Sequence, residues 1–433
     1  MLLSILSSRR KVWPLAALLT AAALFAILSA RSGRARRSAA VVHRARATRA
    51  TSATAPSGRA AAEVPPQEDE RLVLGRKMFF DASLSVPEGT SCASCHDPAH
   101  GFAGNNGSTV GVAQGSRHGR FARRNTPSVL YLRFVRRLHL VWDDDAERPE
   151  AYGGFFWDGR SSSIASLVQQ PLLSPDEMGN RDLRQIAEKL ARAPYADDLR
   201  AVFDDVFATP EKTVEALGFC LEAFLTSRAL SPFSSRYDDF VRGTARLTEL
   251  EMRGLALFQN PEKGACSSCH RLDPASHEPA RSMFTDYGYD AVAAPRNRAL
   301  HANDDPRHFD LGLCERHDPK LHTDDEWFCG SFRTPSLRNV ALRGRFMHNG
   351  VFSSLHDVVA FYATRSNDPG RWYPRGEFDD LPPKLHRYVN TTSPPYDRPE
   401  GDPPALDEAE IEAVVAFLGT LSDRVVPAGT VRD

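Results

Sequence analysis

The chain has 433 residues, of which 42% are hydrophobic and 25% are charged, and its formal net charge at pH 7 is -1. This length predicts two or three domains, and the apolar fraction is sufficient for ordinary globular cores. A charge balance near zero gives no reason to expect nucleic acid as a partner.

The N-terminus has the pattern of a targeting segment. Basic residues at positions 9–11 precede an apolar run over 12–29, an arrangement that leads to export of the chain that follows. The run is near the shortest length that spans a bilayer and also suits a long signal peptide, so residues 1–30 are expected to be a signal peptide or a membrane anchor. Residues 31–66, rich in Ala, Arg, Ser and Thr, are expected to form a disordered linker. Both alternatives place the remaining chain in the periplasm, either free or anchored to the inner membrane.

The ordered part is expected to begin near Glu68, and it contains an internal repeat. Apolar residues at helical spacing occupy 74–80 and 253–258, and each segment leads into a loop with the pattern Cys-x-x-Cys-His. Amphipathic segments over 214–225 and 407–421 predict a closing helix for each half. Strand signals are weak throughout, and Gly, Pro, Asn and Asp are scattered along long connections. The sequence therefore predicts a mainly α fold.

The pattern Cys-x-x-Cys-His, which occurs twice among only seven cysteines, is the attachment signature of a c-type haem. Two thiols add to the vinyl groups of the porphyrin, and the adjacent imidazole ligates the iron. A zinc site is the alternative, but zinc ribbons separate their pairs by about 15–20 residues, whereas Cys95 and Cys266 are 171 positions apart. The residues expected to attach and ligate two haem groups are Cys92, Cys95, His96, Cys266, Cys269 and His270.

Seven segments, taken in order, resemble the bacterial di-haem cytochrome c peroxidase and MauG-like family. They occupy residues 74–81, 91–98, 124–128, 156–160, 171–178, 332–339 and 347–352. The resemblance covers roughly residues 68–425 and implies two tandem cytochrome c-like domains with long loops. The N-terminal domain, 67–240, would carry the haem at which peroxide reacts, and the C-terminal domain, 241–433, would carry the electron-transfer haem.

The resemblance assigns three residues to the peroxide site. Glu177, twenty positions after Trp157, would move a proton between the two peroxide oxygens as acid and base in turn; the alternative is an acidic residue in the first turn of a helix. Trp157 would lie between the haems and carry electrons, with core packing as the ordinary alternative. His118 would be a resting ligand of the same iron, and the alternative is a solvated loop histidine.

The second axial ligand of the C-terminal haem has two candidates. Tyr362 matches the family position by its spacing, and Met347 is the alternative. A phenolate would stabilise ferric iron, whereas a thioether would raise the reduction potential. The resemblance also implies a calcium ion between the haems, with the Asn125 side chain and backbone carbonyls near Arg343 and Arg345 as ligands.

The remaining cysteines and two insertions complete the sequence-based picture. Cys314 and Cys329 are expected to form a disulfide in an exported protein, and Cys220, in an apolar helix, is expected to be a buried free thiol. Residues 271–330 and 363–404 form insertions relative to compact peroxidases, and loops of such length are usually lids or docking surfaces.

These features together predict a di-haem c-type peroxidase. Electrons from a small donor protein, such as a c-type cytochrome or a cupredoxin, would enter at the C-terminal haem, pass to the N-terminal haem and reduce hydrogen peroxide. Two alternatives stay open: a MauG-type oxidase that uses peroxide to oxidise a protein or a small molecule, and a non-enzymatic di-haem electron carrier. A homodimer is a further arrangement that the sequence leaves open.

Overall fold

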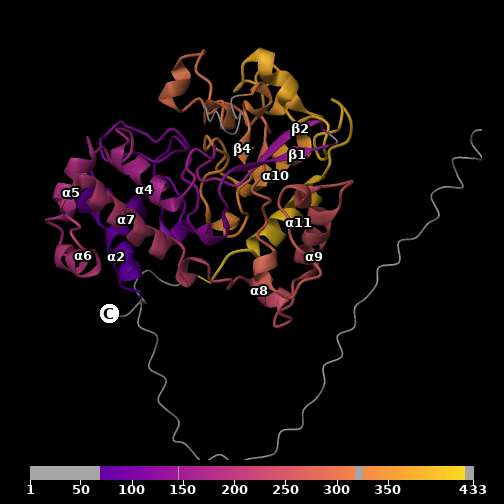
Figure 1. Ribbon diagram of the computed structural model, residues 1–433. Coiled ribbons are helices and arrows are strands. Elements are labelled where there is room, and N and C mark those ends of the chain that lie inside the picture. Colours follow the sequence, from indigo (N-terminus) through magenta and orange to yellow (C-terminus); the bar gives the residue numbers. More distant parts are fainter. Residues whose placement is uncertain (1–68, 145, 317–324, 425–433) are drawn as a thin grey trace, which may run out of the picture. The chain divides into compact units, whose positions relative to one another are not determined.

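The computed structural model describes residues 69–144, 146–316 and 325–424 (Figure 1). The predicted signal peptide or anchor and the predicted linker lie outside these ranges. None of the helices within the ranges is long and apolar enough to cross a membrane. The described chain is mainly helical, with small sheets and long loops, so the predicted fold class is confirmed.

The first half is organised around two helices that cross, one over residues 70–79 and the other over residues 210–225. Asp69 accepts a hydrogen bond from the Arg71 N–H at 3.0 Å and starts the first described helix four residues before the predicted segment. The helices of this half are α2 (Glu70–Phe79), α3 (Cys92–Cys95), α4 (Ile164–Leu173), α5 (Leu183–Leu190), α6 (Ala196–Val202) and α7 (Pro210–Leu225). Helices α2, α4 and α5 all pack against α7. Gly75 lies where α2 crosses α7, and a Cβ atom there would collide with the carbonyl oxygen of Cys220.

The second half repeats this crossing. Thr248 and Glu251 form a capping box that starts the first helix of the repeat. The helices of this half are α8 (Arg236–Val241), α9 (Glu249–Gln259), α10 (Leu355–Thr364) and α11 (Glu408–Gly419). Helices α9 and α10 pack against α11. Gly254 on α9 matches Gly75 in the first half, because its Cβ would collide with the carbonyl oxygen of Ala413 on α11.

Strands are short, as the weak strand signals predicted. Strands β1 (His139–Asp143) and β2 (Arg148–Tyr152) form an antiparallel hairpin with His139 opposite Tyr152. Strands β3 (Tyr289–Asp290) and β4 (Phe332–Arg333) form a second antiparallel pair. Their ladders are too small to organise the fold, so the helices carry it.

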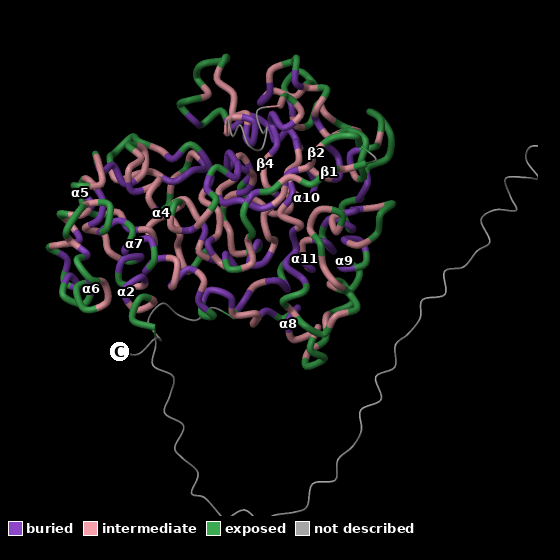
Figure 2. The backbone as a smooth tube through the Cα atoms, viewed as in Figure 1, coloured by how far each residue is buried: buried purple, intermediate pink, exposed green. Residues whose placement is uncertain are grey.

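The two largest apolar cores follow the two helix crossings, and Figure 2 shows buried backbone in both halves. The first core draws its buried residues from Leu74 through Leu230, and the second draws them from Tyr237 through Leu421. Each core includes the crossing helices of its own half. The division between the cores therefore lies between Leu230 and Tyr237, and the domain boundary after residue 240 stays a prediction.

The two predictions for cysteines outside the haem motifs are confirmed. Cys314 and Cys329 form a disulfide with their Cα atoms 4.8 Å apart, a separation typical of disulfides. Both cysteines lie in the first insertion and pack with Leu138 and Ala151 from the hairpin region. Cys220 on α7 is a buried free thiol.

Candidate haem sites

The first Cys-x-x-Cys-His motif forms the short helix α3 and its end. His96 follows α3, and its Nδ1–H donates to the carbonyl oxygen of Phe102 at 3.3 Å. This bond fixes the ring and leaves Nε2 as the free acceptor nitrogen, the tautomer needed by a metal ligand. Burial lowers the pKa of His96 to about 4, so the imidazole is neutral at physiological pH.

The second motif is held in the same way. Cys266 begins the 3₁₀ turn η5 (Cys266–Ser268), and the Nδ1–H of His270 donates to the carbonyl oxygen of Phe284 at 3.0 Å. Burial lowers the pKa of His270 to about 4 as well. The two halves of the chain thus present the same ligand in the same tautomer.

Each motif lines its own cavity. The N-terminal cavity has a volume of about 400 Å³ and contains Cys92, Cys95 and His96 in its wall. The C-terminal cavity, of about 640 Å³, contains the corresponding residues of the second motif. All four motif cysteines are free, and burial raises the pKa of each to about 12. Two thiols, one imidazole with a free nitrogen and a largely apolar wall fit a c-type haem in each cavity.

Glu177 lies in the wall of the N-terminal cavity. It belongs to a turn that follows α4, and not to the first turn of a helix, so the alternative interpretation of this residue is wrong. Its backbone carbonyl accepts a hydrogen bond from the Ser116 N–H at 2.7 Å, which ties the turn to a neighbouring loop. Burial raises the pKa of Glu177, although the charge of Arg160 opposes the shift. A carboxyl group on a cavity wall can act as acid and base in turn, and a raised pKa makes its proton less readily lost than that of an exposed glutamate.

Arg160, which the sequence reasoning did not single out, is fixed beside this carboxyl group. Its guanidinium lies 3.6 Å from the ring centroid of Phe156. Its Nε–H donates to Gln170 Oε1 at 2.8 Å, and it forms an ion pair with Asp158 at 3.0 Å. All four residues line the N-terminal cavity. The arrangement places a fixed positive charge in the wall that also holds Glu177.

The structure does not bring His118 to the N-terminal cavity. The residue is exposed and is absent from the cavity wall. The Gly115 N–H donates to the Arg120 carbonyl at 2.8 Å, which closes the loop and leaves His118 at its tip. The expected ligand therefore lies at the surface, where the alternative interpretation placed it.

Trp157 lies between the two cavities and lines both of them. Its indole Nε1–H donates to the Asn125 carbonyl at 2.8 Å, and its own carbonyl accepts from the Arg333 N–H at 2.8 Å. Asn125 and Arg333 also line both cavities. The partition between the two sites is therefore built around a fixed indole ring.

The predicted calcium ligands lie close together, but they form hydrogen bonds with one another. The Asn125 Nδ2–H groups donate to the carbonyls of Arg345 at 3.1 Å and Met347 at 3.2 Å. Calcium requires oxygen ligands, whereas this arrangement turns an amide N–H toward the carbonyls. These contacts give calcium no support, and it stays a prediction.

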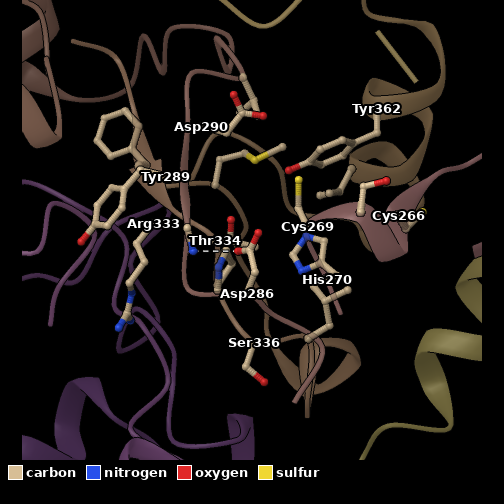
Figure 3. Close-up of a pocket in the computed structure, with 18 of the residues that line it drawn as sticks. Cys266, Cys269, His270, Asp286, Tyr289, Asp290, Arg333, Thr334, Ser336 and Tyr362 are labelled. Atoms are coloured by element: carbon tan, nitrogen blue, oxygen red, sulfur yellow. Dashed lines mark hydrogen bonds between the residues drawn. The ribbon is translucent and has the colours of Figure 1, made fainter. Parts of the chain in front are cut away.

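Both candidates for the second C-terminal ligand line the C-terminal cavity. Tyr362 extends from α10, and Figure 3 shows its hydroxyl pointing into the cavity toward the side that holds Cys269 and His270. Met347 lies in the same wall. Burial raises the pKa of Tyr362. Both candidate groups therefore lie at the C-terminal site.

A buried ionic network between the two halves was missed by the sequence reasoning. Arg124 forms two hydrogen bonds of 2.7 Å with Asp310 and an ion pair of 2.6 Å with Asp158. Arg124 and Asp158 line the N-terminal cavity, whereas Asp310 belongs to the first insertion. Two carboxylates around one guanidinium satisfy its donors away from water. Arg124 lies in a segment that resembles the family, but nothing local indicates its partner in the insertion.

Comparisons with known proteins agree with this geometry. The family described as di-haem cytochrome c peroxidase matches residues 69–246. The methylamine utilization protein MauG of Paracoccus denitrificans is 33% identical over 385 residues, covering 85% of this chain and 92% of that protein. The cytochrome-c peroxidase IdrP2 of a Pseudomonas species is 28% identical and covers 81% of both chains. The crystal structure of the diheme peroxidase BthA from Burkholderia thailandensis is 48% identical with a TM-score of 0.78, over 82% of this chain and 86% of that one.

Proposed function

Because the chain belongs to the family of MauG and the di-haem cytochrome c peroxidases, we propose that it reduces hydrogen peroxide to water with electrons that pass from the C-terminal site to the N-terminal site. The observation that carries the proposal is Glu177 in the wall of the cavity that also holds His96. One peroxide molecule takes up two electrons and two protons and leaves as two molecules of water. The site must therefore supply protons as well as electrons.

Each cavity would hold one covalently attached haem. Cys92 and Cys95 would form the thioethers in the N-terminal cavity and His96 would ligate the iron, and the second motif would act likewise in the other cavity. When bound, the haems supply the redox chemistry. The protein supplies attachment, orientation and proton transfer.

Glu177 is the proposed proton shuttle. Its carboxyl group would accept a proton from the near peroxide oxygen and return it to the departing oxygen. Burial favours the protonated form of the group and raises its pKa, and the charge of Arg160 opposes this shift. Arg160 is itself held by Phe156 and Gln170, and its charge therefore stays in place during the transfer.

Trp157 is the proposed electron link between the sites. It lines both cavities, its indole Nε1–H bond to the Asn125 carbonyl holds the ring, and the Arg333 N–H holds its backbone carbonyl. An indole between two redox centres can divide one long electron transfer into two shorter ones. The donor would be a small c-type cytochrome or cupredoxin in the periplasm, where the protein would be either free or anchored by its N-terminus. A homodimer would be compatible with this arrangement.

Glu177→Gln tests the proposed function. The amide keeps the shape of the side chain but removes the titrating group, so the rate of peroxide-dependent donor oxidation is expected to fall by about 10²–10⁴-fold. Glu188→Gln, the same substitution at an exposed position of α5, is the matched control and should retain the wild-type rate. Haem content and the visible spectrum should be unchanged in both variants. Wild-type turnover by Glu177→Gln would refute the assignment.

A MauG-type oxidase is the second candidate, and Tyr362 in the C-terminal cavity favours it, since an anionic ligand would stabilise high oxidation states of the iron. Electron paramagnetic resonance of the ferric protein tests the ligand. A high-spin signal together with a low-spin signal that Tyr362→Phe alters would support an open peroxide site and a His/Tyr electron store. Two low-spin signals that this change leaves intact would exclude Tyr362 as a ligand. The non-enzymatic electron carrier is less favoured, because a carrier has no need of the Glu177 carboxyl group in the cavity wall.

A further inference from the structure

One arginine in the wall of the C-terminal cavity keeps an unused hydrogen-bond donor. Arg343 lines this cavity and follows the 3₁₀ turn η10 (Val340–Leu342). Its Nη2–H groups donate to the carbonyls of Ser336 and Arg338, both at 2.8 Å. Its Nε–H is buried and has no hydrogen-bond partner in the described part of the chain. A guanidinium that is removed from water with a donor left over is costly unless an anion joins it.

Three other buried arginines are neutralised by the protein itself. Arg338 and Asp238 form an ion pair of 3.0 Å in which neither side chain is exposed, and Arg124 and Arg296 pair with carboxylates in the same way. Within the described ranges no carboxylate forms an ion pair with Arg343, and burial alone lowers its pKa, to about 10. The charge of Arg343 is therefore left for a bound group to neutralise.

The internal repeat identifies the position that corresponds to Arg343 in the first half. Ser128 and Ser336 occupy equivalent places, because each follows Thr-Pro and donates from Oγ to a backbone carbonyl, at 2.6 Å and 2.7 Å. Three residues further on, Tyr131 and Asn339 both adopt the left-handed conformation, with φ of 63° and 61°, and each precedes a 3₁₀ turn. The two segments therefore match residue for residue.

The residue that follows each turn differs between the halves. Val135 follows η3 (Leu132–Phe134), and Arg343 follows η10, each seven positions after its serine. The C-terminal half thus carries a cation where the N-terminal half carries an apolar side chain.

We propose that Arg343 binds a propionate carboxylate of the haem in the C-terminal cavity and thereby raises the reduction potential of that site. The inference rests on the proposed function, because it requires the second Cys-x-x-Cys-His motif to hold a haem. A guanidinium is well suited to a carboxylate, which would take the unused donor. Reduction adds negative charge to the haem, and a nearby cation stabilises the reduced form. Arg343 would therefore favour electron uptake at the site where electrons are proposed to enter.

Arg343→Gln in the full-length, haem-loaded protein tests the proposal. Glutamine can still donate to a neighbouring carbonyl but carries no charge. The sum of the two midpoint potentials, which does not depend on which haem takes the first electron, should therefore fall in a spectroelectrochemical titration. The resonance Raman band of the haem propionates should shift as well. Arg343→Val, which introduces the residue found in the first half, should give both changes, whereas Arg343→Lys keeps the charge and should stay closer to the wild-type potentials.

Arg253→Val is the matched control. Arg253 is an exposed residue of α9 that does not line the cavity. The same loss of a positive charge is screened there by water and salt, so the potentials and the propionate band should keep their wild-type values.

The outcomes separate this inference from the proposed function. If Arg343→Gln and Arg343→Val match the wild type in both readouts while peroxide turnover continues, the role of Arg343 is refuted and the proposed function stands. A fall in the potentials without a shift of the propionate band also refutes it, because Arg343 would then act without contacting the carboxylate. If peptide mass analysis of the wild type finds no haem on Cys266 and Cys269, the proposed function and the inference fail together.

Discussion

Replacement of Gly254 by alanine gives a direct test of the helix crossing in the second half. A Cβ atom at this position would collide with the Ala413 carbonyl oxygen and would lie 2.8 Å from the Cβ of Phe417. The colliding atoms belong to the backbone and to the stem of a side chain, so they cannot rotate away, and α9 and α11 must move apart. Overpacking of this kind costs about 1–3 kcal/mol, and a clash with backbone belongs near the upper end.

The higher helix propensity of alanine offsets part of this loss of unfolding free energy. Alanine is a better helix former than glycine by about 1 kcal/mol in a helix interior. The expected net loss is therefore about 2 kcal/mol. In a domain of this size, that loss corresponds to a fall in the unfolding midpoint of about 4–8 °C.

Gly419→Ala is the matched control. Gly419 also lies in a helix, at the end of α11, but a Cβ atom there would meet nothing within 4 Å. The same chemical change should therefore raise the midpoint, by up to about 4 °C. The assay is thermal unfolding of the haem-loaded protein, followed by far-UV circular dichroism at one scan rate. A midpoint for Gly254→Ala at or above the wild-type value would show that the two helices do not cross at this contact.

Three further predictions follow from the structure. Trp157→Phe removes the Nε1–H bond to the Asn125 carbonyl and should slow steady-state peroxide turnover by about tenfold or more, which is equivalent to about 1.4 kcal/mol. The haem content should be unchanged. Turnover at the wild-type rate would exclude the indole as the electron link. His118→Ala should leave turnover and the ferric resonance spectrum unchanged, since the residue is exposed, and a new high-spin signal would restore it as a ligand. Burial, opposed by Arg296, raises the pKa of Asp380 to about 6, above an unfolded value near 3.9. The native state then binds the extra proton, so the unfolding free energy should fall as pH rises from about 4 to about 6. In urea titrations, Asp380→Asn should flatten this dependence of the unfolding free energy on pH. An unchanged slope would contradict the raised pKa of Asp380.

The features that could be predicted from the sequence are those encoded by neighbouring residues. Apolar spacing over 74–80 and 407–421 predicts helices, and α2 and α11 form there because a helix depends on contacts one turn apart. The Cys-x-x-Cys-His motif is equally local, since two thiols and an imidazole within five positions must reach one porphyrin. Glu177 and Trp157 were found through the resemblance, and the structure places both in the wall of the N-terminal cavity.

The tertiary structure alone decided how distant segments meet. Arg124 and Asp310 are 186 positions apart, and Tyr362 meets Tyr396 across an insertion without helical or strand periodicity. No local pattern marks such pairs, because their contact depends on how irregular loops pack. The same limit explains His118, whose sequence context suggested a ligand while the closed loop turned it to the surface. The local sequence thus determined the haem-attachment motifs and the crossing helices of this protein. Long-range packing decided which distant segments meet around each haem cavity, because the free energy of those contacts is not encoded in any short segment.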